Sequence, residues 1–431
     1  MERSLERFNL TGKTTVVLGA NRGLGRQMVL ASAEAGADLP VASRSRTPLE
    51  TEQIRALYRI SKARVLVLTR ALALEWAEYK INVNAIGPGY FETEPTAPLL
   101  ADEVWQRRLL GKIPPEEDRP AGGPRRDHGL FGLPGLGLCD GPDLLHRREV
   151  PRQGDGAMKK LEYFDFSGKV AVLTGGAGVL CSAMAKAFGE CGARVVILDI
   201  AEEAAARVVH ELREKGIDSL AIRTDVLSKE DLERAVERTL EAFGRVDILI
   251  NGAGGNRPEA TTSPEVSFFE LPEDAVRWVF DLNFLGTFWA SQVFGRLIAE
   301  QGEGAIINIS SMNAYRPLTS VPAYSAAKAA VSNFTQWLAV YMSHNYSDKI
   351  RVNAIAPGFF LTEQNRYLLI DEESGELTPR GRAIIEHTPM GRFGEPEDLV
   401  GVVLWLASPG AEFVHGVVIP IDGGISAYSG V

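Results

Sequence analysis

Two tyrosine–lysine pairs in this sequence could transfer protons, because each places a phenol four residues before an amine. The first pair is Tyr58 and Lys62 in "YRISKA", and the second is Tyr324 and Lys328 in "YSAAKA". Residues four apart lie on one face of a helix, so each phenol would have an ammonium beside it. A free phenol has a pKa of about 10, and a neighbouring positive charge lowers that pKa. Either pair could therefore serve in general acid–base catalysis.

The stretches around these pairs show that the chain contains two copies of one pattern. Residues 11–25 are similar to 167–181, and residues 81–94 are similar to 350–363. From the glycine turn to the tyrosine, the first copy takes 39 residues and the second takes 149. The first copy therefore lacks a large internal part of the pattern.

The domain organisation follows from this comparison. Residues 1–115 form a truncated, degenerate copy, and residues 158–431 form a complete domain of ordinary size. Residues 116–157 are rich in Gly, Pro and Arg without a sustained period, which is typical of a linker or a disordered segment. We expect one complete domain preceded by a truncated partial copy.

The composition excludes several classes of protein. The net charge of −10 argues against a nucleic acid or an anionic membrane as the partner. No run of about 18 apolar residues occurs, and the charged N-terminus lacks a secretory signal. The three cysteines have no metal-ligand spacing. We expect reduced thiols, no bound metal and a cytoplasmic location.

The complete copy alternates between short apolar runs and helical patterns. The runs are β-branched and bounded by turn residues, as buried parallel strands are. This alternation predicts an α/β fold with a doubly wound, Rossmann-like parallel sheet. The expected strands are 169–174, 194–199, 219–225, 246–251, 304–310, 349–357 and 416–423.

The turn after the first of these strands could bind a dinucleotide. Gly175, Gly176 and Gly178 would let the backbone approach a pyrophosphate, which the N-terminus of the following helix also favours. Asp199 ends the second strand, where its carboxylate could accept both ribose hydroxyls of NAD and would repel the 2′-phosphate of NADP. Glycine turns are common, and Asp199 could instead cap a helix, so the alternative of a generic turn stays open.

Further polar and small residues follow the later strands, at the same edge of the expected sheet. Asn283 lies in "DLNFLGT", and Ser310 and Ser311 end the fifth strand, ahead of Tyr324. Residues expected to line the cofactor site are Asp225, Asn251, Ala253, Gly254, Tyr324, Lys328, Pro357, Gly358 and Thr362.

The joint pattern of glycine turn, "NGAG", serine, Tyr-x-x-x-Lys and "PGFFLT" resembles the short-chain dehydrogenase/reductase family. Ser311 stands 13 residues before Tyr324, which matches the catalytic spacing of that family, whereas Ser310 does not. The resemblance implies that Tyr324 exchanges a proton with the substrate oxygen, to which Ser311 hydrogen-bonds. It also implies that Lys328 and the positive nicotinamide ring together lower the pKa of the phenol. Lys328 would in addition hold the nicotinamide ribose, and Asn283 would position a relay water.

One position departs from the family pattern. Many relatives have glycine where Cys181 stands, and glycine there permits tight packing of helix against strand. We expect the cysteine to weaken or shift cofactor binding without abolishing it.

Longer stretches, including "YRPLTSVPAYSAAKAAVSNFTQWLAV" and "HTPMGRFGEPEDL", resemble the branch of the family that contains D-mannonate oxidoreductases, also called fructuronate reductases. The resemblance implies the reversible reduction of D-fructuronate to D-mannonate with NAD, and NADP is the less expected cofactor. Such a substrate carries a carboxylate, so its site needs cations and amides. Arg316 and Arg366 are the first candidates for binding the carboxylate. The other candidates are Asn256, Asn313, Gln364, Asn365 and Arg392.

Other functions remain open at this point. Within enzymes, the alternatives are a gluconate 5-dehydrogenase-like activity and a general polyol or 3-oxoacyl reductase. Outside enzymes, the alternative is a dinucleotide-binding pseudoenzyme, although the complete set of catalytic residue types argues against it.

The first copy resembles the gluconate 5-dehydrogenase-like members of the same family. Gly19, Gly23, Gly25, Tyr58 and Lys62 match the family pattern. The missing part would have carried the catalytic serine and asparagine, so we expect an inactive remnant. Relatives usually assemble through the helix that carries Tyr-x-x-x-Lys, which implies a homotetramer or a dimer for the complete domain.

Overall fold

The structure, a computed structural model, describes most of the complete domain and a few N-terminal residues. Tyr58, Lys62, Gln364, Asn365 and the segment 116–157 lie outside the described residues. The described residues are 162–362, 366, 369–371 and 374–428, together with 17–18, 28, 31–32, 41–42, 69 and 83–85.

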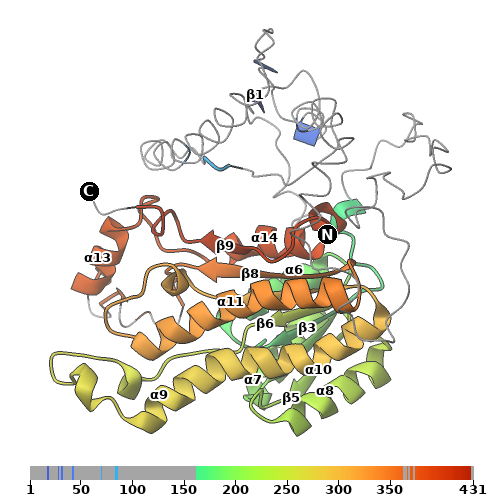
Figure 1. The fold of residues 1–431 in the computed structure, drawn as a ribbon, viewed down its shortest axis with the longest axis horizontal. Coiled ribbons are helices and arrows are strands. Elements are labelled where there is room, and N and C mark those ends of the chain that lie inside the picture. Colours follow the sequence, from blue (N-terminus) through green and yellow to red (C-terminus); the bar gives the residue numbers. More distant parts are fainter. Residues whose placement is uncertain are drawn as a thin grey trace, which may run out of the picture. The chain divides into compact units, whose positions relative to one another are not determined.

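A seven-stranded parallel sheet forms the centre of residues 162–428 (Figure 1). Its strands are β3 (Val170–Thr174), β4 (Arg194–Asp199), β5 (Ser219–Arg223), β6 (Ile248–Asn251), β7 (Gly304–Ile309), β8 (Ile350–Pro357) and β9 (Val418–Ile421). The order β5-β4-β3-β6-β7-β8-β9 places β3 near the middle, with later strands added outward on both sides. All residues of β3, β6 and β8 are buried, because helices cover both faces of a parallel sheet. The predicted doubly wound α/β fold is confirmed.

Helices lie on both faces of the sheet. They are α6 (Val179–Glu190), α7 (Glu202–Glu214), α8 (Lys229–Phe243), α9 (Glu273–Phe280), α10 (Gly286–Gln301), α11 (Pro322–Asn345), α13 (Pro379–Glu386) and α14 (Glu397–Ala407). Helices α8, α10 and α11 form one layer, in which α10 contacts both others. Helices α6, α7 and α14 form the other layer, in which α6 contacts both others. The carboxyl ends of the strands meet at one edge, where ligands bind in folds of this kind.

Local sequence signals explain where these helices begin and end. Ser228 caps α8 by accepting a hydrogen bond from the backbone N–H of Asp231 (3.2 Å), and Gly244 ends it in the left-handed conformation. Helix α11 begins with Pro322, whose missing N–H costs nothing at the first position of a helix.

Three predicted strands end earlier than expected, and one of them is β9, which ends at Ile421 instead of residue 423. Strand β5 ends at Arg223, so Asp225 lies beyond it, where its backbone N–H donates to Asp231 (3.0 Å). Strand β7 ends at Ile309, so Ser310 and Ser311 begin the loop instead of closing the strand. The backbone hydrogen bonds continue one residue past each of these two ends, because Thr224 donates to the carbonyl of Asp199 (2.9 Å) and Ser310 to that of Ile355 (2.8 Å).

The N-terminal part contributes a separate small element. Strands β1 (Val17–Leu18) and β2 (Val41–Ala42) form a parallel pair, with Val17 opposite Val41. Strands β3 and β4 of the complete domain also pair in parallel.

Candidate active site

Ser311, Tyr324 and Lys328 come together at the carboxyl edge of the sheet. Ser311 follows β7, and Tyr324 and Lys328 lie one turn apart on α11. The side chains of Ser311 and Tyr324 are hydrogen-bonded. The Lys328 ammonium lies 5.6 Å from the centre of the Tyr324 ring, and it donates a hydrogen bond of 2.8 Å to the carbonyl of Ile309. The three groups predicted to act together are therefore neighbours.

The surroundings of the Tyr324 phenol and of Lys328 shift the pKa of both groups. Burial raises this pKa above its ordinary value, and the hydrogen bond with Ser311 offsets only part of that effect. Burial also lowers the pKa of Lys328 to about 8. The predicted lowering of the phenol pKa by Lys328 together with a nicotinamide ring stays a prediction, and it would have to overcome this effect of burial.

Asn283 lies in a short π-helix, Asp281–Leu285, between α9 and α10. Its side-chain amide donates to the carbonyls of Gly255 and Val279, both at 2.7 Å, and its oxygen accepts from the backbone N–H of Gly255 (3.2 Å). Asn283 is fully buried. It therefore fixes the loop after β6 against the helices below it. π-Helical turns are frequent at functional sites.

The glycine turn after β3 has the form of a phosphate cradle. Gly175 has a φ of +61°, and a Cβ there would lie 2.7 Å from the Cα of Ala253. Gly176 belongs to the same turn, and Gly178 precedes α6 without capping it through a side chain. The first N–H groups of α6 thus remain available to an anion, as helix N-termini favour.

Asp199 stands beside this turn, at the end of β4. Its carboxylate accepts the backbone N–H groups of Ala177 and Ala201, both at 3.0 Å. Each carboxylate oxygen has a further lone pair, so Asp199 can also accept hydroxyl groups of a ribose. An adenine dinucleotide fits this region for three reasons. The loops after β3 and β6 approach closely, the N-terminus of α6 has no side-chain cap, and the Asp199 carboxylate can bind a ribose.

The "NGAG" loop after β6 forms the second wall of the cradle. The Thr174 hydroxyl accepts the N–H groups of Gly252 (3.1 Å) and Ala253 (3.3 Å), a role that the sequence analysis missed. A Cβ on Gly254 would lie 3.2 Å from the Lys328 Nζ. The same Cβ would lie 2.6 Å from the Asn283 Oδ1, so glycine at this position allows the loop to approach both side chains.

Asn251 supports this wall from inside the sheet. Its side-chain amide donates to Ser291 and to Asn308, both at 2.8 Å. Its side-chain oxygen is buried and has no hydrogen-bond partner among the described residues. Asn251 therefore links β6 to β7 and α10, and its predicted contact with the cofactor stays a prediction.

Cys181 lies where the two walls meet. A Cβ on Gly252 would collide with its sulfur, and the thiol points to the carbonyl of Thr174 (3.9 Å). Burial raises the pKa of the thiol to about 12. The cysteine is a packed, neutral side chain, and any influence on the cofactor would act through the spacing of the loops.

The remaining predicted cofactor residues lie along the same edge. Pro357 ends β8, and a Cβ on Gly358 would lie 2.7 Å from the Cα of Asp422. Thr362 is partly buried in the following loop, and Asp225 accepts the N–H of Leu227 at 2.9 Å beyond β5.

The candidate substrate residues have different surroundings. The Arg316 guanidinium donates to the backbone carbonyl of Tyr428, and Arg392 forms two hydrogen bonds with Asp398, at 2.7 and 2.9 Å. Arg366 is exposed. Arg392 is therefore already neutralised by a carboxylate.

The two described amide candidates have different partners. Asn256 donates to the Thr261 hydroxyl at 2.8 Å, and the buried Asn313 donates its backbone N–H to the Ser311 hydroxyl at 3.2 Å. Asn313 thus helps to orient Ser311.

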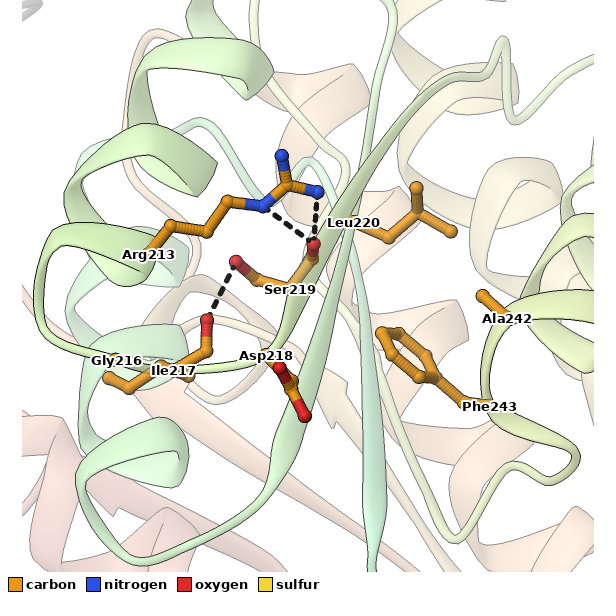
Figure 2. Close-up of a pocket in the computed structure, with 8 residues that line it drawn as sticks. All are labelled: Arg213, Gly216, Ile217, Asp218, Ser219, Leu220, Ala242 and Phe243. Carbon is orange, nitrogen blue, oxygen red and sulfur yellow. Dashed lines mark hydrogen bonds between the residues drawn. The ribbon is translucent and has the colours of Figure 1, made fainter.

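Figure 2 shows a hollow elsewhere on the domain, at the amino end of β5. Its volume is about 400 Å³, and its lining includes Leu220 and Phe243. Arg213 crosses it and donates to the backbone carbonyl of Ser219 at 3.2 and 2.7 Å. The catalytic group lies at the carboxyl edge of the sheet, so this hollow is not part of the site.

Known proteins share this sequence and fold. Residues 47–117 and 177–426 match the family described as enoyl-(acyl carrier protein) reductase. An uncharacterized oxidoreductase of Bacillus subtilis, UxuB, is 51% identical over 276 residues, which are 62% of this chain and 98% of that protein.

Two solved structures carry dinucleotides. A proposed D-mannonate oxidoreductase from Haemophilus influenzae with bound NAD is 47% identical, with a TM-score of 0.59 over 62% of this chain and 98% of that chain. A gluconate 5-dehydrogenase from Burkholderia cenocepacia with NADP and tartrate is 30% identical, with a TM-score of 0.55 over 62% of this chain and 99% of that chain.

The fold and the site define a nucleotide-dependent oxidoreductase that acts on alcohols. The chain belongs to the short-chain dehydrogenase/reductase family. Among the described residues, no helix has the length and apolar character needed to cross a bilayer.

Proposed function

We propose that the protein interconverts D-mannonate and D-fructuronate with NAD. The observation that carries the proposal is the meeting of Ser311, Tyr324 and Lys328 beside a dinucleotide cradle. The 47% identity to the NAD-bound Haemophilus influenzae protein, which is named as a D-mannonate oxidoreductase, supports the choice of substrate.

Each of the three side chains has its own role in proton transfer. A bound nicotinamide supplies the site that gives or accepts hydride. In the oxidation, Tyr324 accepts the proton of the substrate hydroxyl, and in the reduction it returns that proton to the carbonyl oxygen. Ser311 hydrogen-bonds the same oxygen, and the Lys328 ammonium stabilises the phenolate that the oxidation requires.

The test of the substrate is a steady-state assay of the full chain with NAD. D-Mannonate is compared with D-gluconate and with a neutral polyol such as D-mannitol. A 3-oxoacyl thioester is assayed in the reductive direction, with NADH in place of NAD. We expect the highest kcat/KM for D-mannonate. A higher value for D-gluconate would favour the gluconate 5-dehydrogenase-like alternative, and no turnover of any compound would favour a pseudoenzyme.

We propose NAD as the preferred cofactor because of Asp199. Its carboxylate faces the turn where the adenosine ribose would lie, and a 2′-phosphate there would meet like charge. In Asp199→Ser this repulsion is absent, so the ratio of kcat/KM for NAD to that for NADP should fall. An unchanged ratio would show that another residue selects the cofactor.

We propose that residues 1–157 are a truncated copy and a linker without catalytic function. The match of residues 47–117 to the family supports the kinship of the first segment, whose shortened sequence lacks the catalytic serine. In the full chain, Tyr58→Phe should leave turnover unchanged. A large loss in this variant would show that the first copy takes part in catalysis.

We propose that the complete domain forms a homotetramer or a dimer through α11. Trp337 and Val340 are each 56% exposed on this helix, and Tyr341 is 39% exposed beside them. Their spacing of three and four residues places them on one face. We also propose a cytoplasmic location, because the spacing of the three cysteines is not typical of a disulfide framework.

A further inference from the structure

An arginine in the loop after β6 lies flat against a tryptophan of α9. The guanidinium carbon of Arg257 is 3.7 Å from the centre of the Trp278 ring. A guanidinium at this distance gains both cation–π attraction and stacking, and the contact limits the orientations of its fork of N–H donors. Arg257 is therefore held in place at the surface of the domain.

This pair borders the catalytic tyrosine. Trp278 and Tyr324 pack against the same apolar cluster. The cluster consists of Ala260, Ala275, Val279 and Ala323. Both aromatic side chains therefore pack against the same apolar cluster, and Arg257 stacks on the ring of Trp278.

The chain leading to Arg257 runs along the catalytic group. Gly254 approaches the Lys328 ammonium, and Gly255 is hydrogen-bonded to Asn283 through both its N–H and its carbonyl. Arg257 follows two residues later, so its Cα lies within about 8 Å of the Cα of Gly255. The side chain of an arginine can span much of the remaining distance to a bound substrate.

The charge of Arg257 is not neutralised within the described structure. Arg257 forms no ion pair with any carboxylate of the described residues. By contrast, Arg277, which precedes Trp278 in the sequence, forms an ion pair with Glu273 at 2.7 Å. Arg392 forms an ion pair with Asp398, also at 2.7 Å. A cation beside a catalytic group, oriented by an aromatic ring and without a carboxylate partner, is suited to bind an anionic substrate group.

We propose that Arg257 is a specificity-determining residue that binds the carboxylate of a sugar-acid substrate, and that Trp278 positions its guanidinium. This inference rests on the proposed function, because it requires an acidic substrate in the same site. The planar fork matches a carboxylate with two parallel hydrogen bonds, which a lysine could not supply.

The test compares an acid with its uncharged isostere. The full chain is assayed with NAD and with D-mannonate or D-mannonamide, in the wild type and in Arg257→Gln. We expect KM for the acid to rise about 10- to 100-fold, as for the loss of a charge-assisted hydrogen-bonded contact. The kcat for the acid and the KM for the amide should change little, so the preference for the acid disappears.

Three further variants separate binding from folding. Arg277→Gln removes the same charge next to Trp278 and should behave as the wild type. Arg257→Lys keeps the charge without the fork, so its preference for the acid should be intermediate. Trp278→Leu should raise KM for the acid more than it lowers kcat. NAD affinity and the melting temperature, measured for each variant, identify any general loss of structure.

The outcomes distinguish this inference from the proposed function. If the wild type prefers the acid and Arg257→Gln keeps that preference, Arg257 does not bind the carboxylate and the inference is overturned. If the wild type prefers another sugar acid to D-mannonate, the proposed substrate is wrong, and the same comparison with that acid and its amide tests Arg257. If the wild type prefers the amide, both proposals fail.

Discussion

The Lys328 ammonium lies 5.6 Å from the centre of the Tyr324 ring and donates its hydrogen bond to the carbonyl of Ile309. The lysine thus faces the phenol without forming a direct ion pair with it, and it is only 3% exposed. Burial of this charge lowers the pKa of Lys328 to about 8 and works against the stability of the fold. The buried ammonium is therefore available for the proposed proton transfer, although its burial destabilises the folded state.

Lys328→Met should lower activity and raise stability. The lowered pKa corresponds to a penalty of about 3 kcal/mol for the buried ammonium at neutral pH. Lys328→Met removes this penalty, but it also removes the hydrogen bond to Ile309, which costs about 1 kcal/mol of stability. We expect the free energy of unfolding in urea to increase by about 2 kcal/mol while kcat falls about 100-fold or more.

The pH dependence of the same variant gives a second check. The ordinary pKa of lysine, 10.5, lies above the folded value of about 8, so the unfolded chain binds more protons between these pH values. Wild-type stability should therefore rise relative to Lys328→Met as the pH increases from 8 to 10.5. A variant that is less stable than the wild type at pH 7 would show that the ammonium contributes favourable contacts overall.

Gly252 and Cys181 should be energetically coupled. A Cβ on Gly252 collides with the thiol and also lies 2.9 Å from the carbonyl of Thr174. Gly252→Ala should cost about 1–3 kcal/mol of unfolding free energy, as overpacking of a core does. In the background of Cys181→Gly that cost should be smaller, because one of the two collisions is absent.

A matched control uses Gly401 on α14, where a Cβ would meet no atom within 4 Å. The effects of Gly401→Ala and Cys181→Gly should add, whereas those of Gly252→Ala and Cys181→Gly should not. Additive effects in both cycles would mean that the thiol does not limit the approach of the two loops.

His415 should make the fold sensitive to mild acid. Its Nδ1 accepts the backbone N–H of Val352 at 3.1 Å, and its Nε2 lies 2.7 Å from the carbonyl of Ala339. Both contacts suit the neutral ring with a proton on Nε2. Burial, together with the charge of Arg351, lowers the pKa of His415 below 6.5.

The sign of the effect follows from this lowered pKa. The unfolded chain binds the proton more readily, so stability falls as the pH drops below 6.5. In His415→Gln this contribution is missing, and the slope of unfolding free energy against pH should be smaller just below pH 6.5. The comparison is made by urea unfolding at several pH values, and equal slopes would assign the acid sensitivity to other groups.

Trp337→Arg should disrupt assembly without disrupting the site. The Trp337 ring stacks on Tyr341 at 4.9 Å and is more than half exposed, so it is suited to pack against a second copy. An arginine there would place charge in the centre of an apolar contact. Light scattering after size-exclusion chromatography should show a homo-oligomer for the wild type and a smaller species for the variant. A monomeric wild type would refute the proposed interface.

The fold could be predicted from the sequence because its signals are local and periodic. The strands stand out as short β-branched runs, and the Tyr324–Lys328 spacing fixes one face of a helix. The order of the strands follows from the doubly wound pattern once the family is recognised. What could not be predicted is where each strand stops, because Asp225 and Ser311 lie beyond the strand ends in loops whose hydrogen bonds depend on the folded structure.

The chemistry of the site was less accessible from sequence. The pKa of Tyr324 depends on how much water the fold removes, which no motif encodes. The pairing of Arg257 with Trp278 joins residues 21 apart, and only "GGNR" after β6 could have drawn attention to it. Arg316 has the right residue type for a carboxylate, but its contact with the backbone of Tyr428 is visible only in the structure.

The central claim is that the Tyr324 hydroxyl moves the proton in an NAD-linked oxidation, and Tyr324→Phe tests it most directly. The rate of NADH formation from D-mannonate is measured at saturating NAD, and the NAD affinity is measured by titration in the same preparation. We predict that the rate falls about 100-fold or more while the affinity for NAD is unchanged. Turnover of Tyr324→Phe at the wild-type rate would contradict the claim.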